Sequence, residues 1–327
     1  MSRLAFSVSI FLTTALTILG AHAQESGTNW PNQPVRMVVP FPAGGPADIL
    51  ARVVAEKLGG GWGQPVIVEN RPGANTAVGA AHVAKMAPDG YTLFVVMDVT
   101  MVLNPITTKN LPYDPAKDFT PITLLSKNTS LLMTRVEDGA TSVADLIARG
   151  KANPGKLNYG AGIITTRLAA EFFNKEVGIT GQYIPFQGSP PTVQGLLNKS
   201  VDYIVDGAAS SLPLIQAGKF RALAKTNDGP MPALPQLKSM AEEAGKPALR
   251  DISTWIGLVA PTGTPEFIVD KVADGVAKIY ADPAMIERLQ KAGINAVNDK
   301  PQEMAGFIQT ELKRWDKVVK DTGIELN

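Results

Sequence analysis

Short apolar runs that alternate with helical patterns are the feature of this sequence that most restricts its fold. The first run, Val35–Val39, is rich in β-branched residues and lies between prolines, which is typical of a buried strand. A helical pattern starts at Pro46, where proline suits the first turn and Asp48 complements the helix dipole. A strand, a helix and another strand follow, expected at 66–69, 76–86 and 91–97. This β-α-β-α-β order predicts a parallel sheet with helices on both faces.

The same alternation starts again after residue 155. Strands are expected at 156–159, 182–184, 201–205 and 221–225, with helices at 166–176, around 192–198 and in a short segment up to Ala217. A strand in "WIGLVAPTGTP" and amphipathic helices complete the chain, the helices at 267–280, 283–292 and 301–321. The two units share an architecture without detectable sequence similarity, so we expect two lobes and no duplicated repeat.

The N-terminus has the pattern of a secretory signal. Arg3 precedes an apolar stretch over 4–20 that hydroxyl residues interrupt, and Ala21-His22-Ala23 matches the small-x-small cleavage pattern. We therefore expect residues 1–23 to be removed. An uncleaved anchor helix, the alternative, needs about 18 or more apolar residues, and this run is shorter and broken. About 300 residues remain, more than one hydrophobic core usually serves, which again favours two lobes.

Composition excludes several classes of function. The chain has no cysteine, which rules out thiolate catalysis, cysteine-ligated metal and redox chemistry. Signal cleavage leaves His82 as the only histidine, within a helical pattern, so a histidine metal cluster is excluded and a surface role is favoured over a catalytic triad. Lys and Arg number 31 against 30 Asp and Glu, without a long basic run, so no nucleic-acid or membrane-surface footprint is expected.

A glycine loop, "PFPAGGPADILAR" at 40–52, joins the first strand to the first helix. It lacks the Lys-Ser/Thr of a phosphate-binding P-loop, and its glycine spacing does not match the dinucleotide pattern. Gly44 and Gly45 allow unusual backbone angles and close approach of a ligand, while the helix from Pro46 offers unpaired N–H groups. Such a loop suits a carboxylate. A plain tight βα turn is an equally good interpretation of this segment alone.

A second loop of the same kind, "NYGAGIITTRLAAEFF", favours ligand binding. Ligands of open α/β sheets bind beyond the carboxyl ends of the strands, so we expect the two loops to face one another across a cleft. At least one of Thr165 and Thr166 is expected to be the N-cap of its own helix. The loop "IPFQGSPPT" and Asp206, at the end of "VDYIVDG", are further candidates. Phe41 is expected to contact the core with one edge in the cleft.

Several long motifs in order resemble the extracytoplasmic solute-binding proteins of the tripartite tricarboxylate transporter family, also known as Bug proteins. The motifs include "WPNQPVRMVVPFPAGGPADILAR", "GQPVIVENRPGANTAVGAAHVAKMAPDGYTL", "LPYDPAKDFTPI", "WIGLVAPTGTP" and "IQTELKRWDKVVKDTGI". The resemblance spans nearly all of the mature chain. It implies an α/β type II periplasmic-binding-protein fold with a ligand cleft between two lobes. The expected division is 24–124 with 254–327 for the first lobe and 125–253 for the second.

In that family, main-chain amides, hydroxyls and bridging waters hold the ligand. Carried over by position, the resemblance implies ligand-binding roles for Phe41, Ala43, Gly44, Gly45 and Asp48 in the first lobe and for Ala161, Thr165, Thr166 and Asp206 in the second. The second-lobe loop departs from the family: it is shorter, and Arg167 replaces a histidine. Gln187-Gly188-Ser189-Pro190 also stands where the family has Lys-Gly-Gly-Gly. The usual dicarboxylate preference is therefore open, and we hypothesise that Arg167 reaches a second acidic group; a surface arginine is the alternative.

The resemblance implies a periplasmic receptor without enzymatic activity or cofactor. We expect it to capture a small organic acid (a di- or tricarboxylate, an amino acid or an aromatic acid) by lobe closure and to present it to a membrane permease. We expect a monomer that binds no nucleic acid and is not inserted in the membrane after signal cleavage. Two alternatives stay open: a ligand sensor that feeds a two-component signalling system, and an aspartate-based enzyme on the same fold.

Overall fold

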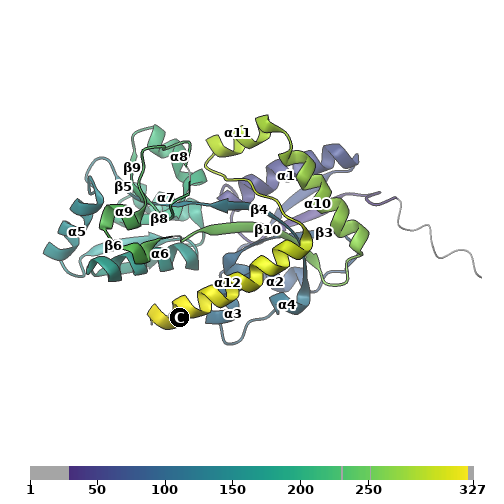
Figure 1. Ribbon diagram of the computed structural model, residues 1–327, viewed down its shortest axis with the longest axis horizontal. Coiled ribbons are helices and arrows are strands. Elements are labelled where there is room, and N and C mark those ends of the chain that lie inside the picture. The colour runs from purple at the N-terminus through teal and green to yellow at the C-terminus, as the bar shows by residue number, and fades with distance from the viewer. Residues whose placement is uncertain (1–28, 230, 251, 323–327) are drawn as a thin grey trace, which may run out of the picture.

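Two lobes lie side by side in the computed structural model, each built on a five-stranded sheet with helices on its faces (Figure 1). The structure describes residues 29–229, 231–250 and 252–322. The expected signal peptide, 1–23, lies outside these residues. Within the described ranges no helix has the length and apolar character needed to cross a membrane.

The first lobe contains a mixed sheet in which one strand opposes the other four. The strand order is β2 (Val66–Asn70), β1 (Val35–Val39), β3 (Thr92–Met97), β10 (Thr254–Pro261) and β4 (Phe119–Asn128). β1 is parallel to β2 and β3, whereas β10 is antiparallel to β3 and β4. β3 and β10 are buried along their whole length, because helices cover both faces of the sheet.

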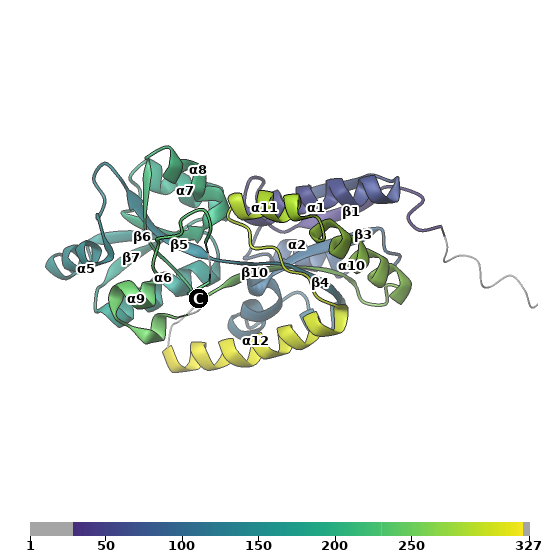
Figure 2. The same cartoon turned by 45° about the horizontal axis from the view of Figure 1, so that its top comes forward.

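Five longer helices and three short ones surround this sheet among the described residues. α1 and α10 pack together on one face, and α2 and α12 lie on the other (Figure 1). α11 lies beside α1 and extends to the second lobe (Figure 2). The helices are α1 (Pro46–Trp62), α2 (Ala77–Val83), the π-helix η1 (Val99–Leu103), α3 (Asn104–Thr107), α4 (Pro115–Asp118), α10 (Glu266–Tyr280), α11 (Pro283–Lys291) and α12 (Pro301–Thr322).

The second lobe repeats the topology of the first. Its strand order is β7 (Gly181–Pro185), β6 (Leu157–Ala161), β8 (Tyr203–Gly207), β5 (Ser130–Arg135) and β9 (Phe220–Lys225). β5 alone opposes its neighbours. The helices are α5 (Val143–Ala152), α6 (Ile164–Val177), α7 (Ser189–Leu197), α8 (Ala208–Gln216), α9 (Met240–Ala244) and the 3₁₀ helix η2 (Pro247–Leu249). The expected two-lobed α/β fold with mostly parallel sheets is confirmed.

The chain passes between the lobes through two connections. β4 ends at Asn128 and β5 starts at Ser130, so Thr129 alone separates a strand of the first sheet from a strand of the second. The return runs from β9 to β10. The expected division at 124/125 falls inside β4, which remains paired with β10 as far as Asn128. β4 and β5 were not predicted, because the short apolar stretches in "FTPITLLSKN" and "SLLMTR" lack the sustained alternation that marks a half-buried strand.

Candidate ligand-binding cleft

Two cavities occupy the space between the lobes, at the carboxyl ends of the strands, where ligands of open α/β sheets bind. The inner cavity measures about 40 Å³, enough for a few water-sized groups. The outer cavity measures about 480 Å³. Phe41, Pro42 and Ile163 line both, so the two cavities meet at these side chains.

The first-lobe loop between β1 and α1 forms one wall of the inner cavity. Gly44 has φ +82°, a left-handed angle that glycine adopts without strain. Gly45 is the N-cap of α1, and no side chain caps the helix. Phe41 and Gly45 line the cavity as expected, with Phe41 largely buried, whereas Ala43 and Gly44 are exposed to solvent and do not line it.

Asp48 does not reach either cavity, contrary to the ligand-binding role expected for it. Its carboxylate accepts hydrogen bonds from the Gly44 N–H at 2.8 Å, Asn70 Nδ2 at 2.8 Å and Arg52 Nε at 3.0 Å. Burial alone would raise its pKa, but these bonds outweigh burial and hold the pKa below its ordinary value. Asn70 also donates to the Phe41 carbonyl at 3.0 Å. Asp48 therefore fixes the loop between β1 and α1 in position.

The second-lobe loop after β6 leads into α6, which starts two residues earlier than expected. Its N-cap is Ile163, so neither threonine is the cap, contrary to expectation. Thr166 lines the inner cavity and donates its hydroxyl to the Ile163 carbonyl at 3.0 Å. Thr165 lines neither cavity; its hydroxyl donates to Asp98 in the first lobe. Ala161 is fully buried within β6 and is also absent from the cavity walls.

Arg167 lies in the wall of the outer cavity. Its Nε donates to Glu171 Oε1 at 2.6 Å, and its guanidinium lies 4.6 Å from the centre of the Tyr183 ring. The side chain is 19% exposed, which is low for a surface arginine. Glu171 balances the charge of Arg167 and, with the ring, holds its guanidinium at the edge of the cavity.

Asp206, at the end of β8, lines the inner cavity as expected. The carboxylate accepts hydrogen bonds from the Ser189 hydroxyl and from the Gly207 backbone. Burial raises its pKa to about 7, although these two hydrogen bonds act in the opposite direction. Asp206 can therefore hold a proton near neutral pH and donate a hydrogen bond into the cavity.

Three polar residues of the inner cavity were missed by sequence reasoning, namely Asn128, Ser130 and Thr254, whereas a fourth, Ser189, lies in the candidate loop "IPFQGSPPT". Asn128 and Ser130 flank the crossing between the lobes, and Thr254 starts the returning strand β10. Asn128 and Ser130 were missed because β4 and β5 were not predicted, and Thr254 precedes by one residue the strand expected in "WIGLVAPTGTP". The substituted segment Gln187–Pro190 was a signal for Ser189, which begins α7.

Four helices begin at the inner cavity, and none of their N-termini is capped by a side chain. They are α1, α6, α7 and α8, which contribute Gly45–Ala47, Ile163 with Thr166, Ser189 with Pro190, and Gly207–Ala209. Uncapped first turns direct the positive ends of helix dipoles at the cavity, with backbone N–H groups from α1, α6 and α8, whereas the two prolines after Ser189 leave α7 only the Ser189 N–H. None of the described residues that line the inner cavity is cationic. An anion bound here would be held by the main chain.

The lobes touch at glycines, where any side chain would collide with the opposite lobe. A Cβ at Gly188 would lie 2.9 Å from Pro42 Cδ, and a Cβ at Gly207 would lie 2.9 Å from Pro46 Cγ. A Cβ at Gly293, after α11, would lie 2.8 Å from Leu212 of α8. The structure is therefore a closed arrangement of the two lobes.

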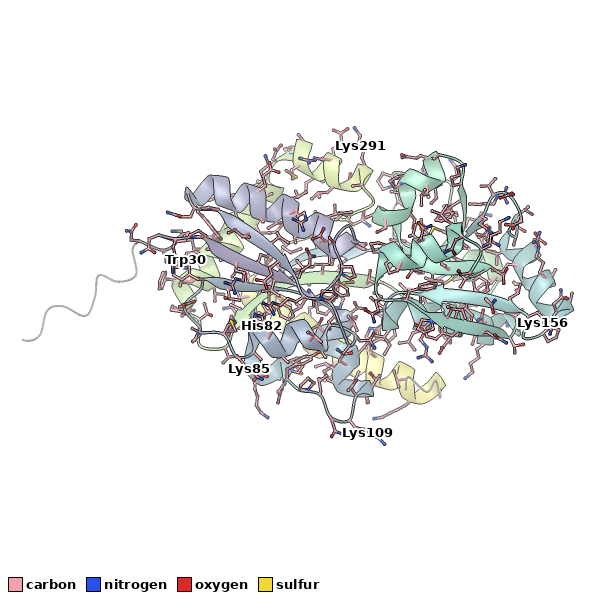
Figure 3. The ribbon with its side chains drawn as sticks, turned by 180° about the vertical axis from the view of Figure 1, so that it is seen from behind. Trp30, His82, Lys85, Lys109, Lys156 and Lys291 are labelled. Carbon is pink, nitrogen blue, oxygen red and sulfur yellow. The ribbon has the colours of Figure 1, made fainter. Side chains whose placement is uncertain are left out.

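The part of the chain that the structure describes has few other groups that could bind a metal ion or act as a catalyst. No group of three or more His, Asp or Glu side chains there could hold a metal ion. His82 lies in α2 (Figure 3) and lines neither cavity. Burial lowers its pKa, as do the charges of Arg71 and Arg36.

Comparison with known proteins identifies the family. The sequence matches the family described as "Tripartite tricarboxylate transporter family receptor" over residues 50–324. The chain belongs to this family. The resemblance inferred from the motifs is thereby confirmed, as is the expectation of a receptor and not an enzyme.

Solved structures of this receptor type superpose closely on the chain. Rpa4515 of R. palustris, solved with adipate, is 34% identical with a TM-score of 0.87, covering 90% of this chain and 99% of its own. MatC (Rpa3494) from Rhodopseudomonas palustris, solved with bound malate, is 31% identical with a TM-score of 0.80, covering 89% and 100%. The periplasmic binding protein BugD is 31% identical with a TM-score of 0.84, covering 90% and 99%.

Proposed function

We propose that this receptor captures a small carboxylate-bearing organic acid in the periplasm, by closure of its lobes, and delivers it to a tripartite tricarboxylate-type membrane permease. The observation that carries the proposal is the convergence of four uncapped helix N-termini on a cavity without a cationic side chain. Such a site favours a carboxylate through backbone N–H groups and helix dipoles. The adipate and malate of two related structures are ligands of this chemical kind.

The two cavities would hold different parts of one ligand: a carboxylate head in the inner cavity and the rest of the molecule, its tail, in the outer cavity. The inner cavity has room for a carboxylate beside Gly45, Thr166 and Asp206. The rest of the molecule would pass Phe41 into the outer cavity, where Arg167 faces it. A second acidic group on the tail would meet this guanidinium. The ligand-binding residues proposed are those that line the cavities: Phe41, Gly45, Thr166, Arg167 and Asp206, with Asn128, Ser130, Ser189 and Thr254 added.

Closure explains how binding would be signalled to the permease. The inner cavity takes its walls from both lobes, so a ligand makes all its contacts only in the closed state and shifts the equilibrium towards it. We propose that the lobes rotate about the two crossings, at 128–130 and between β9 and β10.

A thermal-shift screen of the mature protein tests the proposal. The panel contains aliphatic mono-, di- and tricarboxylates, amino acids and aromatic acids, each beside its amide or alcohol analogue. We expect at least one acid to raise the melting temperature, with a rise that grows with the logarithm of its concentration above the dissociation constant, and its uncharged analogue to have no effect, because only the folded state binds. Equal stabilisation by acid and amide would contradict recognition of an anion by helix N-termini.

A further inference from the structure

A hydrogen bond joins the two lobes through residues that line neither cavity. Asp98 follows β3 in the first lobe, and its Oδ2 accepts a hydrogen bond from the Thr165 hydroxyl in the first turn of α6, in the second lobe. Both residues are buried, with exposures of 0% and 1%. They belong to different lobes, so this interlobe bond exists only while the lobes are together.

The interlobe bond lies at the partition between the two cavities. Met97 and Thr166, neighbours of the bonded pair, line the inner cavity, whereas Val99 and Ile164, the neighbours on the other side, line the outer one. The bonded residues line neither. The bond therefore spans the closed interface at a place that a ligand does not occupy.

The surroundings of Asp98 suit a protonated carboxyl. Its Oδ1 is buried without a hydrogen-bond partner. The Thr165 hydroxyl and the N–H groups of Val99 and of Asp98 itself bond the carboxyl, and the charged group facing it is Glu311 of α12, which is paired with Arg314 at 3.1 Å. The part of the chain that is described places no cation against Asp98. An ionised carboxylate would be poorly compensated here.

We propose that the Asp98–Thr165 bond sets the balance between the open and closed lobes, and that it engages with Asp98 protonated. The inference rests on the proposed function in one respect, the closure of the lobes, and does not depend on which acid is bound.

Asp98 would then take up a proton when the lobes close. Burial raises the pKa of Asp98 in the closed form to about 7, and opening would expose the carboxyl to water, where its ordinary value is 3.8. The ratio of closed to open protein would therefore rise about tenfold from pH 8 to pH 6. Asp206, also buried at the cleft with a raised pKa, adds its own contribution, so variants must be compared at fixed pH.

The test measures the distance between the lobes in ligand-free protein by single-molecule fluorescence transfer. The chain has no cysteine, so Lys109→Cys and Lys156→Cys supply two specific, exposed labelling sites in opposite lobes (Figure 3). Thr165→Val removes the donor and keeps the side-chain shape, and we expect the ratio of closed to open protein at pH 6 to fall about tenfold. Thr134→Val is the matched control, because this buried hydroxyl donates at 2.8 Å to the Ala140 carbonyl within the second lobe.

Asp98→Asn tests the protonation step. The amide keeps an acceptor for Thr165 and cannot ionise, so we expect this variant to be more closed than the wild type at pH 8 and its ratio of closed to open protein to change less than the wild type's between pH 8 and pH 6. The proposal is overturned if Thr165→Val behaves as Thr134→Val does, or if Asp98→Asn is no more closed than the wild type at pH 8. Both results come without ligand, so they are separate from the outcome of the carboxylate screen.

Discussion

Replacement of Gly207 by alanine tests whether close approach of the lobes controls ligand capture. Gly207 is the N-cap of α8 with φ −63° and ψ 138°, angles that alanine adopts without strain. The added methyl group would lie 2.9 Å from Pro46 Cγ of the first lobe, closer than carbon atoms pack. The second lobe itself can therefore accept the substitution, and only the closed arrangement resists it.

The expected loss of ligand affinity follows from the free-energy cost of overpacking the closed interface. Forcing a methyl group into a filled space costs about 1–3 kcal/mol, and the whole cost falls on the closed state. Each 1.4 kcal/mol is a factor of ten in the equilibrium, so we expect the dissociation constant for the preferred acid to rise by about 5- to 150-fold.

Isothermal titration calorimetry measures the affinity, and small-angle scattering of ligand-free protein measures the opening of the lobes. Gly60→Ala in α1 is the control, because a Cβ there meets nothing within 4 Å and should leave both measurements unchanged. We expect the Gly207→Ala protein to have a larger radius of gyration. Weaker binding with an unchanged radius would mean that the methyl group obstructs the ligand and would refute the closure argument.

Three further changes have expected outcomes. Asp48→Ala should lower the free energy of unfolding by about 1–3 kcal/mol, because the Gly44 and Asn70 donors lose their acceptor, and urea denaturation measures this loss. Arg167→Ala should weaken diacids more than matched monoacids, about tenfold in a titration series, and equal losses for both would remove Arg167 from recognition. The raised pKa of Asp206 means that the folded state binds the proton more tightly than the unfolded state; its stabilising contribution is complete below pH 3.8 and is lost as pH rises through about 7. Melting temperatures from pH 4 to pH 8 should therefore fall less steeply in Asp206→Asn than in the wild type.

The first-lobe loop shows how far sequence patterns reach. Strand β1, the turn at Gly44 and the helix from Pro46 were all predicted, because each depends on residues close together in the chain. The role of Asp48 was not, because its partner Asn70 lies 22 residues away and is brought near by the pairing of β1 with β2.

The start of α6 in the second lobe shows the same limit of sequence patterns. Thr165 and Thr166 are adjacent at the start of α6, and the sequence motif gives no reason to distinguish them. Thr166 nevertheless faces the inner cavity, whereas Thr165 bonds Asp98 across the interface. Successive helix residues point about 100° apart, so which of them meets the opposite lobe depends on how that lobe is placed.

The sequence by itself determined the family, the two α/β lobes and the glycine loops that end at the cleft, because strand propensity, turn chemistry and helix starts are local properties. Only the tertiary structure decided which residues form the cavity walls, since Ser130, Ser189 and Thr254 meet there from distant segments. It also decided the pairing of Asp98 with Thr165 and the raised pKa of Asp206, because burial and interlobe contact arise only when the two lobes close on each other.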